Sequence, residues 1–406
     1  MNWINFPQSG TFILFFMADS ISYWYWFFLI QGFVITLLSV PVITTFARKY
    51  RLVYVPNQRS SHSIPVPALG GVAIYAGFMI SFLLLRYVGY LESFKVSLVI
   101  LLIFVIGLVD DLKDLRAWWK MIAFIILASF ISLTQGLSIT NLHGFLSISS
   151  INGIFSFIIT VFVILSILNA INLIDGVDGL AGGLGIFILS VLSWIFYKTN
   201  HLDYLILTLP MILALLAFLI FNIWGRNYKI FMGDSGSLML GMVISISLIR
   251  FMGLQHHEVS EAITVSPVTA FSLVIVPMFD MIHVFIKRIL KGRSPFHPGK
   301  EHIHHTYIKL GFSHRSVTMI LVAYSIGFFI ISQLTSKFFS EYISLAVVVS
   351  LALFVWNYPE FYLKKNLRRY VMKRKIEHGN RKNIHKVEIH PKDLEIKTES
   401  LELKSA

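Results

Sequence analysis

The sequence predicts an all-α polytopic membrane protein, and three observations lead to this fold class. Hydrophobic residues make up 56% of the 406 residues and charged residues only 14%, whereas soluble domains usually carry about 25% charged residues. Apolar runs of about 20 residues, the length that crosses a bilayer as a helix, recur from Trp24 to Trp356. Short polar connections separate these runs, so the chain length gives no count of soluble domains.

Eleven apolar segments account for this pattern, and each is expected to form one membrane-spanning helix. They cover approximately residues 23–46, 67–86, 96–109, 117–134, 152–169, 180–196, 204–221, 236–252, 268–286, 316–333 and 343–357. Prolines within or beside these segments are tolerated, because neighbouring helices can satisfy the freed carbonyl groups. A further run at 11–17 is too short to span and is expected to lie at the membrane interface.

Lysine and arginine residues predict the orientation, because cytoplasmic connections of membrane proteins carry an excess of them. One set of connections holds 16 of these residues and the other set holds five. We expect the N-terminus outside and the C-terminus in the cytoplasm. The cytoplasmic connections are then 47–66, 110–120, 169–179, 222–235 and 287–315.

The expected organisation is an integral membrane domain at 1–357 followed by a basic cytoplasmic tail at 358–406. The tail holds 13 of the 34 lysine and arginine residues, which explains much of the net charge of +13. Such charge suits an anionic membrane surface, and we expect no nucleic-acid partner. The chain has no cysteine, which excludes a thiolate nucleophile, cysteine-ligated zinc and disulfides.

Aspartates gather on the side assigned to the cytoplasm. A charge embedded in the bilayer costs at least about 2.5 kcal/mol, and neighbouring carboxylates also repel each other. A cation should offset this repulsion, and Mg²⁺ is the usual partner of oxygen ligands near phosphates. Six of the ten aspartates lie at or just beyond cytoplasmic helix ends: Asp110, Asp111, Asp114, Asp175, Asp178 and Asp234.

One segment, residues 169–181, carries the most specific pattern. Its polar residues follow each other at three-residue steps, which lines them along one face of a helix: Asn169, Asn172, Asp175 and Asp178. Glycines 176 and 179 permit close backbone approach. A glycine-rich seam between packed helices is the alternative, but it does not explain four polar residues in step.

Three further stretches carry chemistry. Adjacent Asp110 and Asp111 point to different helix faces, so one can bind metal while the other faces substrate; taken alone they form an ordinary polar helix end. Asp234, flanked by glycines in the segment 231–237, suits a metal or phosphate site. Residues 57–71 could form an anion-binding turn around Arg59 and His62, or a plain polar loop.

The longest internal cytoplasmic connection is rich in histidine, at positions His297, His302, His304, His305 and His314. This spacing is compatible with a zinc site. Histidines that contact phosphate groups agree better with the expected Mg²⁺. Within the ninth segment, Asp280 and His283 lie one turn apart. They are expected to form a mutually satisfied pair, with a proton relay as the alternative.

Together and in this order, these stretches resemble the polyprenyl-phosphate N-acetylhexosamine-1-phosphate transferases, which form glycosyltransferase family 4. The matching stretches are Arg59–His62 with Pro67–Gly71, Asp110–Asp111, Asn172–Gly179, Asn222 with Phe231–Gly236, and Ser294–Phe296 with His302–His305. Because Ile303 interrupts the histidines, the chain resembles the branch that uses UDP-GlcNAc and undecaprenyl phosphate. The branch that uses UDP-MurNAc-pentapeptide typically has three contiguous histidines. His297 and Lys300–Glu301 depart from the acid and arginine common in the first branch.

The resemblance implies transfer of GlcNAc-1-phosphate from UDP-GlcNAc to undecaprenyl phosphate, with release of UMP. The reaction would occur at the cytoplasmic face of a bacterial inner membrane and start a lipid-linked cell-envelope polysaccharide such as O-antigen. Another UDP-N-acetylhexosamine, or phospho-MurNAc-pentapeptide, is the alternative substrate. A cation-coupled secondary transporter is the alternative of a different class, although transporter sites tend to lie at the midplane.

The resemblance also implies roles for individual residues. The catalytic residues would be Asp110, Asp111, Asp175 and Asp234. The cofactor would be Mg²⁺, with Mn²⁺ as a substitute, held by Asp234, Asp175 and Asp111. The substrate contacts would come from Arg59, His62, Asn172, Gly176, Asp178, Asn222, Phe231, Arg293, His302, His304 and His305. The expected partners are a UDP-sugar, a polyprenyl phosphate lipid and the membrane, and a homodimer is compatible with the sequence.

Overall fold

A computed structural model describes residues 20–53, 65–87, 94–148, 150–255, 263–294, 299 and 301–379. These residues form helices and an isolated antiparallel bridge between Asn141 and Ser150, which confirms the all-α class. Several predictions fall outside the described residues, namely those for the run at 11–17, Arg59, His62, His297 and the end of the tail.

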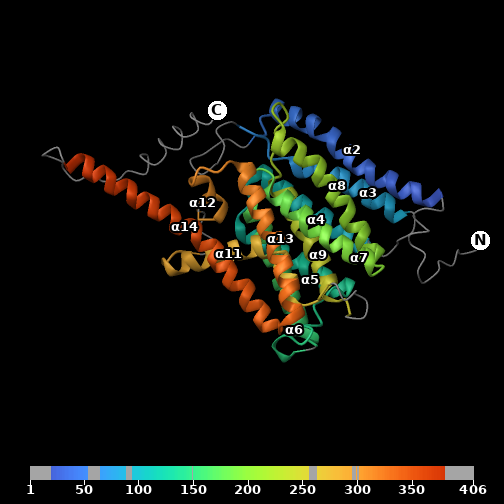
Figure 1. Ribbon diagram of the computed structural model, residues 1–406. Helices are drawn as coiled ribbons and strands as arrows, with labels where there is room; N and C mark the ends of the chain where they lie inside the picture. Colours follow the sequence, from blue (N-terminus) through green and yellow to red (C-terminus); the bar gives the residue numbers. More distant parts are fainter. Residues whose placement is uncertain are drawn as a thin grey trace, which may run out of the picture.

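The helices of the described part follow the apolar segments of the sequence in order. They are α2 (Ser20–Lys49), α3 (Gly70–Tyr87), α4 (Phe94–Lys113), α5 (Ala117–Gln135), η2 (Phe145–Ser147), α6 (Gly153–Ile174), α7 (Leu180–Lys198), α8 (Leu202–Trp224), α9 (Gly233–Met252), α10 (Pro267–Leu273), α11 (Ile275–Leu290), α12 (Ile303–Lys309), α13 (His314–Phe338) and α14 (Glu341–Gly379). Figure 1 shows α2 and α3 side by side along one side of the bundle and α13 and α14 along another.

Eight helices among the described residues are long and apolar enough to cross a membrane, and α10 with α11 adds a ninth if the pair is one span. The apolar part of α3, at 70–85, is shorter than a usual span, and α4 carries charged residues near both ends. Each of the eleven predicted segments therefore coincides with a helix or with the α10–α11 pair. Length and composition support a multi-pass membrane protein, while eleven crossings remain a prediction.

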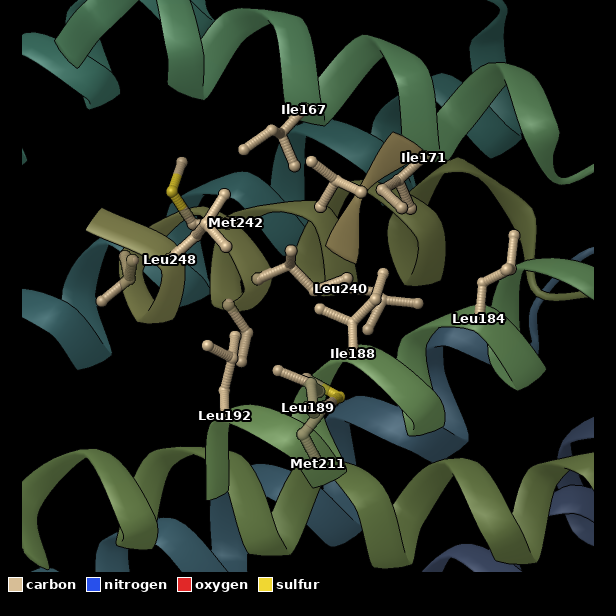
Figure 2. Close-up of a cluster of buried hydrophobic side chains, with 14 of the residues drawn as sticks. Ile167, Ile171, Leu184, Ile188, Leu189, Leu192, Met211, Leu240, Met242 and Leu248 are labelled. Carbon is tan, nitrogen blue, oxygen red and sulfur yellow. The ribbon is translucent and has the colours of Figure 1, made fainter. Parts of the chain in front are cut away.

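The core is organised around α9. Almost all of α9 is buried, and it packs against α4, α6, α3 and α7. Figure 2 shows Leu240 and Met242 of α9 among Ile167 and Ile171 of α6, with Ile188 of α7 close by. Serine and glycine residues along α9, among them Ser245, Ser247 and Gly241 against Leu168 of α6, favour a place inside the bundle rather than against lipid. The N-terminus of α9 is consequently held firmly by its neighbours, and this end carries Asp234.

The predicted single helix at 268–286 is wrong: α10 and α11 meet at Val274 with a bend of 85°. Pro277 lies in the first turn of α11, where a missing backbone N–H removes no hydrogen bond that a first turn needs. In a continuous helix, Pro277 has no backbone N–H to donate to the carbonyl oxygen of Leu273, so that hydrogen bond would be missing. The bend directs α11, with Asp280, toward the histidine-bearing α12.

The boundary predicted at 357 between the membrane domain and the tail falls within one helix, because α14 continues without a break from Glu341 to Gly379. Figure 1 shows its C-terminal half extending away from the bundle. The buried Trp356 and an ion pair between Glu360 and Lys287 of α11 attach its middle to the rest of the protein. The first basic residues of the tail are therefore a direct extension of the last apolar helix.

Candidate functional site

Three helix ends meet where the catalytic aspartates were predicted. The carboxylate of Asp111, at the end of α4, accepts hydrogen bonds from the backbone N–H of Asp234 at 2.7 Å and of Ser235 at 3.0 Å. The Ser235 hydroxyl adds a third at 2.6 Å. A carboxylate at a helix N-terminus satisfies free N–H groups and favours the helix dipole. Asp111 thereby joins α4 to the start of α9.

Glycine makes this approach of α4 to α9 feasible. A Cβ atom on Gly107 of α4 would lie 2.5 Å from Ser235 Cα and 2.7 Å from Asp234 O, where no side chain fits. Gly233 begins α9 with φ +73°, and a Cβ there would meet Ala68 O at 2.2 Å. The glycines around Asp111 and Asp234 therefore set how closely the two acids approach.

The Asp234 side chain is held from α6 and α5. Asn172 Nδ2 donates to Asp234 Oδ1 at 2.9 Å and to Ser237 Oγ at 3.0 Å, and Lys120 Nζ lies 3.3 Å from Asp234 Oδ2. The prediction that Asn169, Asn172, Asp175 and Asp178 share one helix face is wrong, because α6 ends at Ile174 and the two aspartates lie in the turn that follows; the helix still brings Asn172 to Asp234. Asn169 instead donates to Leu165 O within its own helix at 2.7 Å.

Lys120 is a functional candidate that the sequence analysis counted only for orientation. Its ammonium lies 2.5 Å from Asp110 Oδ2 and 3.3 Å from Asp234 Oδ2, so it bridges the two carboxylates. Asp110 is buried and also accepts the backbone N–H of Leu115 at 2.7 Å. A lysine in the short connection that follows paired aspartates was the available signal. Lys120 offsets the repulsion of Asp110 and Asp234 in the structure.

Asp175 ends α6 beside these groups. Desolvation by the surrounding protein, followed by the charges of Asp234, Asp111 and Asp178, raises the pKa of Asp175 to about 8. A raised carboxyl pKa means that the negative charge is disfavoured in these surroundings. The fold therefore concentrates more negative charge at this point than Lys120 alone offsets.

These residues fit a divalent cation of the Mg²⁺ type. The described residues contain no group of three or more His, Cys, Asp or Glu side chains close enough to form a cage of protein ligands. Mg²⁺ does not need one, because it usually takes one or two carboxylates and completes its shell with water and substrate phosphates. Asp175 and Asp234 fit that role. Asp111 already accepts three hydrogen bonds, which favours positioning of Asp234 over metal binding.

The glycine-containing segments 67–71 and 231–236 pair with each other. Gly70 N–H donates to Phe231 O at 2.8 Å, Gly71 N–H to Met232 O at 2.7 Å, and Phe231 N–H to Pro67 O at 2.8 Å. A Cβ on Gly71 would lie 2.3 Å from Gly236 N. The sequence was compatible with either an anion-binding turn or a plain polar loop in this region. In the structure, the segment 67–71 supports the backbone that leads into Asp234.

Asn222 supports the frame of the site rather than an open contact surface. Its Oδ1 accepts the N–H of Gly179 at 2.6 Å and its Nδ2 donates to Ile230 O at 2.8 Å. Both ends of the amide are engaged with backbone, and the side chain is buried. This geometry favours a positioning role over the predicted contact with substrate.

Asp178 lies in a second polar group next to the aspartates. Lys229 Nζ is 2.7 Å from Asp178 Oδ2, and His314 Nδ1 is 3.4 Å from the same oxygen. Thr318 of α13 donates to the Asp178 carbonyl at 2.8 Å. The sequence analysis placed Asp178 in the site but missed Lys229 and His314, which come from distant connections. A nucleotide at this group would meet a lysine ammonium and an imidazole as well as a carboxylate.

His304 is the predicted residue that the fold buries most deeply against the aspartate turn. It is 1% exposed, and neither ring nitrogen has a hydrogen-bond partner within the described part of the chain. Burial, followed by the charge of His305, lowers the pKa of His304 to about 3. His304 is therefore neutral at physiological pH and suits a hydroxyl better than a charge-charge contact with phosphate.

The backbone of Gly176 lies against that ring. A Cβ atom at Gly176 would lie 2.6 Å from His304 Nε2. The Gly176→Ala variant should therefore displace the ring, and we expect kcat/KM to fall about 10²-fold, because misplacing a catalytic group by about 1 Å can cost that much.

The matched control for Gly176→Ala is Gly327→Ala. Nothing lies within 4 Å of a Cβ at Gly327, so this variant should retain activity and melting temperature in detergent. Equal activity of the two variants would remove the Gly176–His304 contact from the site.

The predicted pair of Asp280 and His283 is wrong. Asp280 Oδ2 instead accepts from His302 Nδ1 at 2.7 Å, and Asp280 Oδ1 accepts the Ile303 N–H at 2.8 Å. His283 Nε2 has no hydrogen-bond partner among the described residues. One-turn spacing brought Asp280 and His283 onto one helix face, but the bend before α11 directs Asp280 to the histidine segment.

Arg293 does not join the aspartates in the structure. It is exposed after α11, and no hydrogen bond or ion pair connects its side chain to another described residue. Glu301, one of the departures from the family pattern, bonds Lys291 at 2.7 Å and Arg288 at 3.1 Å. Lys291 is the main favourable partner that lowers the pKa of Glu301. Glu301, directly before His302, is thus anchored to the end of α11.

The family profile described as Glycosyl transferase family 4 matches residues 93–252, the part that contains Asp110, Asp175 and Asp234. The chain is 32% identical over 339 residues to the undecaprenyl-phosphate alpha-N-acetylglucosaminyl 1-phosphate transferase of Escherichia coli strain K12, covering 81% of this chain and 89% of the relative. The proteins of the same name from Yersinia pestis and Pasteurella multocida strain Pm70 are 29% identical over 337 residues and 33% over 298 residues. These alignments cover 81% and 72% of this chain, and 90% and 81% of the relatives.

The resemblance inferred from the motifs is thereby confirmed over most of the chain. More than two thirds of the sequence aligns with relatives that are named 1-phosphate transferases, and the apolar helices of this chain agree with a multi-pass membrane protein. The chain belongs to glycosyltransferase family 4 and is a membrane phosphotransferase of that family.

Proposed function

We propose that this enzyme transfers GlcNAc-1-phosphate from UDP-GlcNAc to undecaprenyl phosphate, releasing UMP, and so starts a lipid-linked cell-envelope polysaccharide. One observation carries the proposal: Asp110 and Asp234 converge from two helix ends on Lys120, and Asp175, at the end of a third helix, is close enough for the charge of Asp234 to act on it. Phosphoryl transfer depends mainly on positioning and charge neutralisation, and this group supplies both. The names of the relatives support the choice of undecaprenyl phosphate as the lipid and of an N-acetylglucosaminyl group as the sugar.

The reaction joins an oxygen of the lipid phosphate to the β-phosphorus of the UDP-sugar, while the bond from that phosphorus to the bridging oxygen breaks. Bound Mg²⁺ would neutralise charge on the pyrophosphate and on the departing UMP. Asp110 holds the lipid phosphate for attack and accepts its proton where one is present. Lys120, released from Asp110 by that contact, remains close enough to bind a phosphate oxygen.

The other polar group would bind the remainder of the nucleotide. Asp178, held by Lys229, suits the uridine, with Phe231 as a stacking partner for uracil. His304 and its neighbours His302 and His305 suit the sugar and its phosphate. A neutral His304 can form hydrogen bonds with sugar hydroxyls. A sugar that lacks the matching hydroxyl would leave a buried ring nitrogen of His304 without a partner, which strongly disfavours its binding.

Sugar choice can be measured directly as UMP release by purified protein in detergent with undecaprenyl phosphate. We expect turnover with UDP-GlcNAc and refusal of UDP-MurNAc-pentapeptide, since no feature of the 287–315 connection suggests a peptide site. UDP-GalNAc serves as the control, because it differs at a single hydroxyl. Efficient transfer from UDP-MurNAc-pentapeptide would contradict the branch, and a chain that transports cations without releasing UMP would support the transporter alternative.

The proposed topology has eleven crossings in a bacterial inner membrane, with the N-terminus outside and the aspartates at the cytoplasmic face. The cysteine-free chain allows a direct test, because each introduced cysteine is the only one. Lys198→Cys, at the end of α7, should react with an impermeant maleimide in spheroplasts. Asn227→Cys, in the 225–232 connection, should react only after permeabilisation. The reverse pattern would invert the orientation.

A further inference from the structure

Asp280 is a buried carboxylate that the proposed reaction does not use directly. It is 1% exposed in α11, and three donors from two other segments, the start of α12 and the middle of α14, surround it. His302 Nδ1 lies 2.7 Å from Oδ2, whereas Ile303 N and Trp356 Nε1 lie 2.8 Å and 3.2 Å from Oδ1. A buried carboxylate is unfavourable unless it is hydrogen-bonded, and this arrangement satisfies both of its oxygens.

The contacts determine which nitrogen of His302 carries the proton. Ile303 N–H and Trp356 Nε1–H can only donate, so Asp280 Oδ1 is an acceptor. An ionised carboxylate accepts at its second oxygen as well, so His302 Nδ1 must donate. Nε2, at the opposite edge of a neutral ring, is then the nitrogen with the lone pair. Carboxylates orient functional histidines in the same way in metal and hydrolase sites.

His302 is connected to the site through the neighbouring ring. The rings of His302 and His304 are parallel within 10°, with centroids 5.6 Å apart. His304 in turn lies against Gly176, next to Asp175. A rotation of His302 would therefore disturb the imidazole that faces the aspartate turn.

We propose that Asp280 is a positioning residue: it fixes His302 as the Nδ1–H tautomer and, with Trp356, sets the place of the histidine segment 302–305 against the Asp175–Gly176 turn. The proposal rests on the proposed function only for its effect on turnover. It makes α14, through Trp356, part of the support of the active site.

The tautomer can be measured without any activity. In protein labelled with ¹⁵N-histidine, the ring resonances of His302 are identified as those that disappear in the His302→Gln variant. In the unsubstituted protein, we expect these resonances to show the Nδ1–H form. Asp280→Asn should convert it to the Nε2–H form, because the amide oxygen must serve Ile303 N–H and Trp356 Nε1–H. The amide NH₂ then faces Nδ1, which has to accept. An Nε2–H form in the unsubstituted protein overturns the proposal even if Asp280→Asn fails to fold.

A double-mutant cycle separates positioning from a general structural role. Asp280→Asn should lower kcat/KM for UDP-GlcNAc about 10–100-fold, the usual effect of losing a partner that orients a functional histidine. In a His302→Gln background the same change should have less than about a twofold further effect, because coupled residues are not additive. Fully additive losses would show that Asp280 acts elsewhere and overturn the proposal.

His283→Gln is the matched control on the same helix. His283 lies one turn from Asp280 without bonding it, so kcat/KM and the His302 resonances should stay unchanged. An unsubstituted protein that releases no UMP from any UDP-sugar would refute the proposed function, while the tautomer measurement would still decide the role of Asp280.

Discussion

The Asp234→Asn variant should lose about 10²–10³-fold in kcat while still inserting into the membrane, the usual effect of removing one charge-stabilising group from such a site. The substitution preserves shape, so Asn172 and Lys120 can still contact the side chain. It removes the negative charge that the fold places at the N-terminus of α9, opposite Lys120 at 3.3 Å. The loss should therefore appear in the chemical step more than in the amount of folded protein.

The measurement is UMP release at saturating UDP-GlcNAc, together with the melting temperature in detergent. Asp203→Asn is the matched control, because Asp203 lies in the first turn of α8 whereas Asn222 of the site lies near the end of that helix. About 19 residues of α-helix separate the two positions by roughly 29 Å. Asp203→Asn should retain activity, and near-normal turnover of Asp234→Asn would remove Asp234 from the site.

Chelation with EDTA should abolish turnover, and Mg²⁺ or Mn²⁺ should restore it. The reason is the excess of carboxylates around Asp175, whose pKa rises to about 8 because desolvation and three neighbouring acids disfavour its charge. Oxygen ligands of this type, next to a pyrophosphate, suit Mg²⁺. Zinc usually takes histidine or cysteine ligands in four-coordinate sites, and no such group occurs among the described residues.

The experiment needs a control that separates metal removal from unfolding. The chelated protein should keep its melting temperature within a few degrees and recover full turnover when Mg²⁺ is returned. Zinc should not replace it. Turnover that persists in EDTA, or that returns with zinc alone, would contradict the assignment of Asp175 and Asp234 as metal ligands.

Helical periodicity and apolar length predicted the positions of the helices well, because lipid allows few alternatives to a helix. The step of three from Asn169 to Asp178 predicted a shared helix face, but α6 ends at Ile174, so Asp175 and Asp178 lie in the turn after it, while Asn172 of the helix does reach Asp234. Neither pattern could predict the bend of 85° between α10 and α11. Proline is compatible with a kinked membrane helix or with the start of a new one, and only the packing around Val274 decides between them.

Residue types alone also did not separate catalytic from supporting roles. Asn222 and Asp111 belong to the expected motifs, yet their side chains hold backbone groups of Gly179 and Asp234. Lys120 and Lys229 looked like ordinary positive charges beside a membrane: Asp110 lies only ten residues before Lys120, but their other partners, Asp234 and Asp178, lie 114 and 51 residues away in sequence. Such long-range pairs carry no local signal.

The sequence by itself determined the membrane-protein class, the family and the set of aspartates proposed for the site, because apolar length and the spacing of a few polar residues are local properties. The tertiary structure decided how those aspartates are neutralised and which histidine each acid holds. Asp280 pairs with His302 rather than with His283, since a hydrogen bond depends on where two helices cross and not on the distance between residues along the chain.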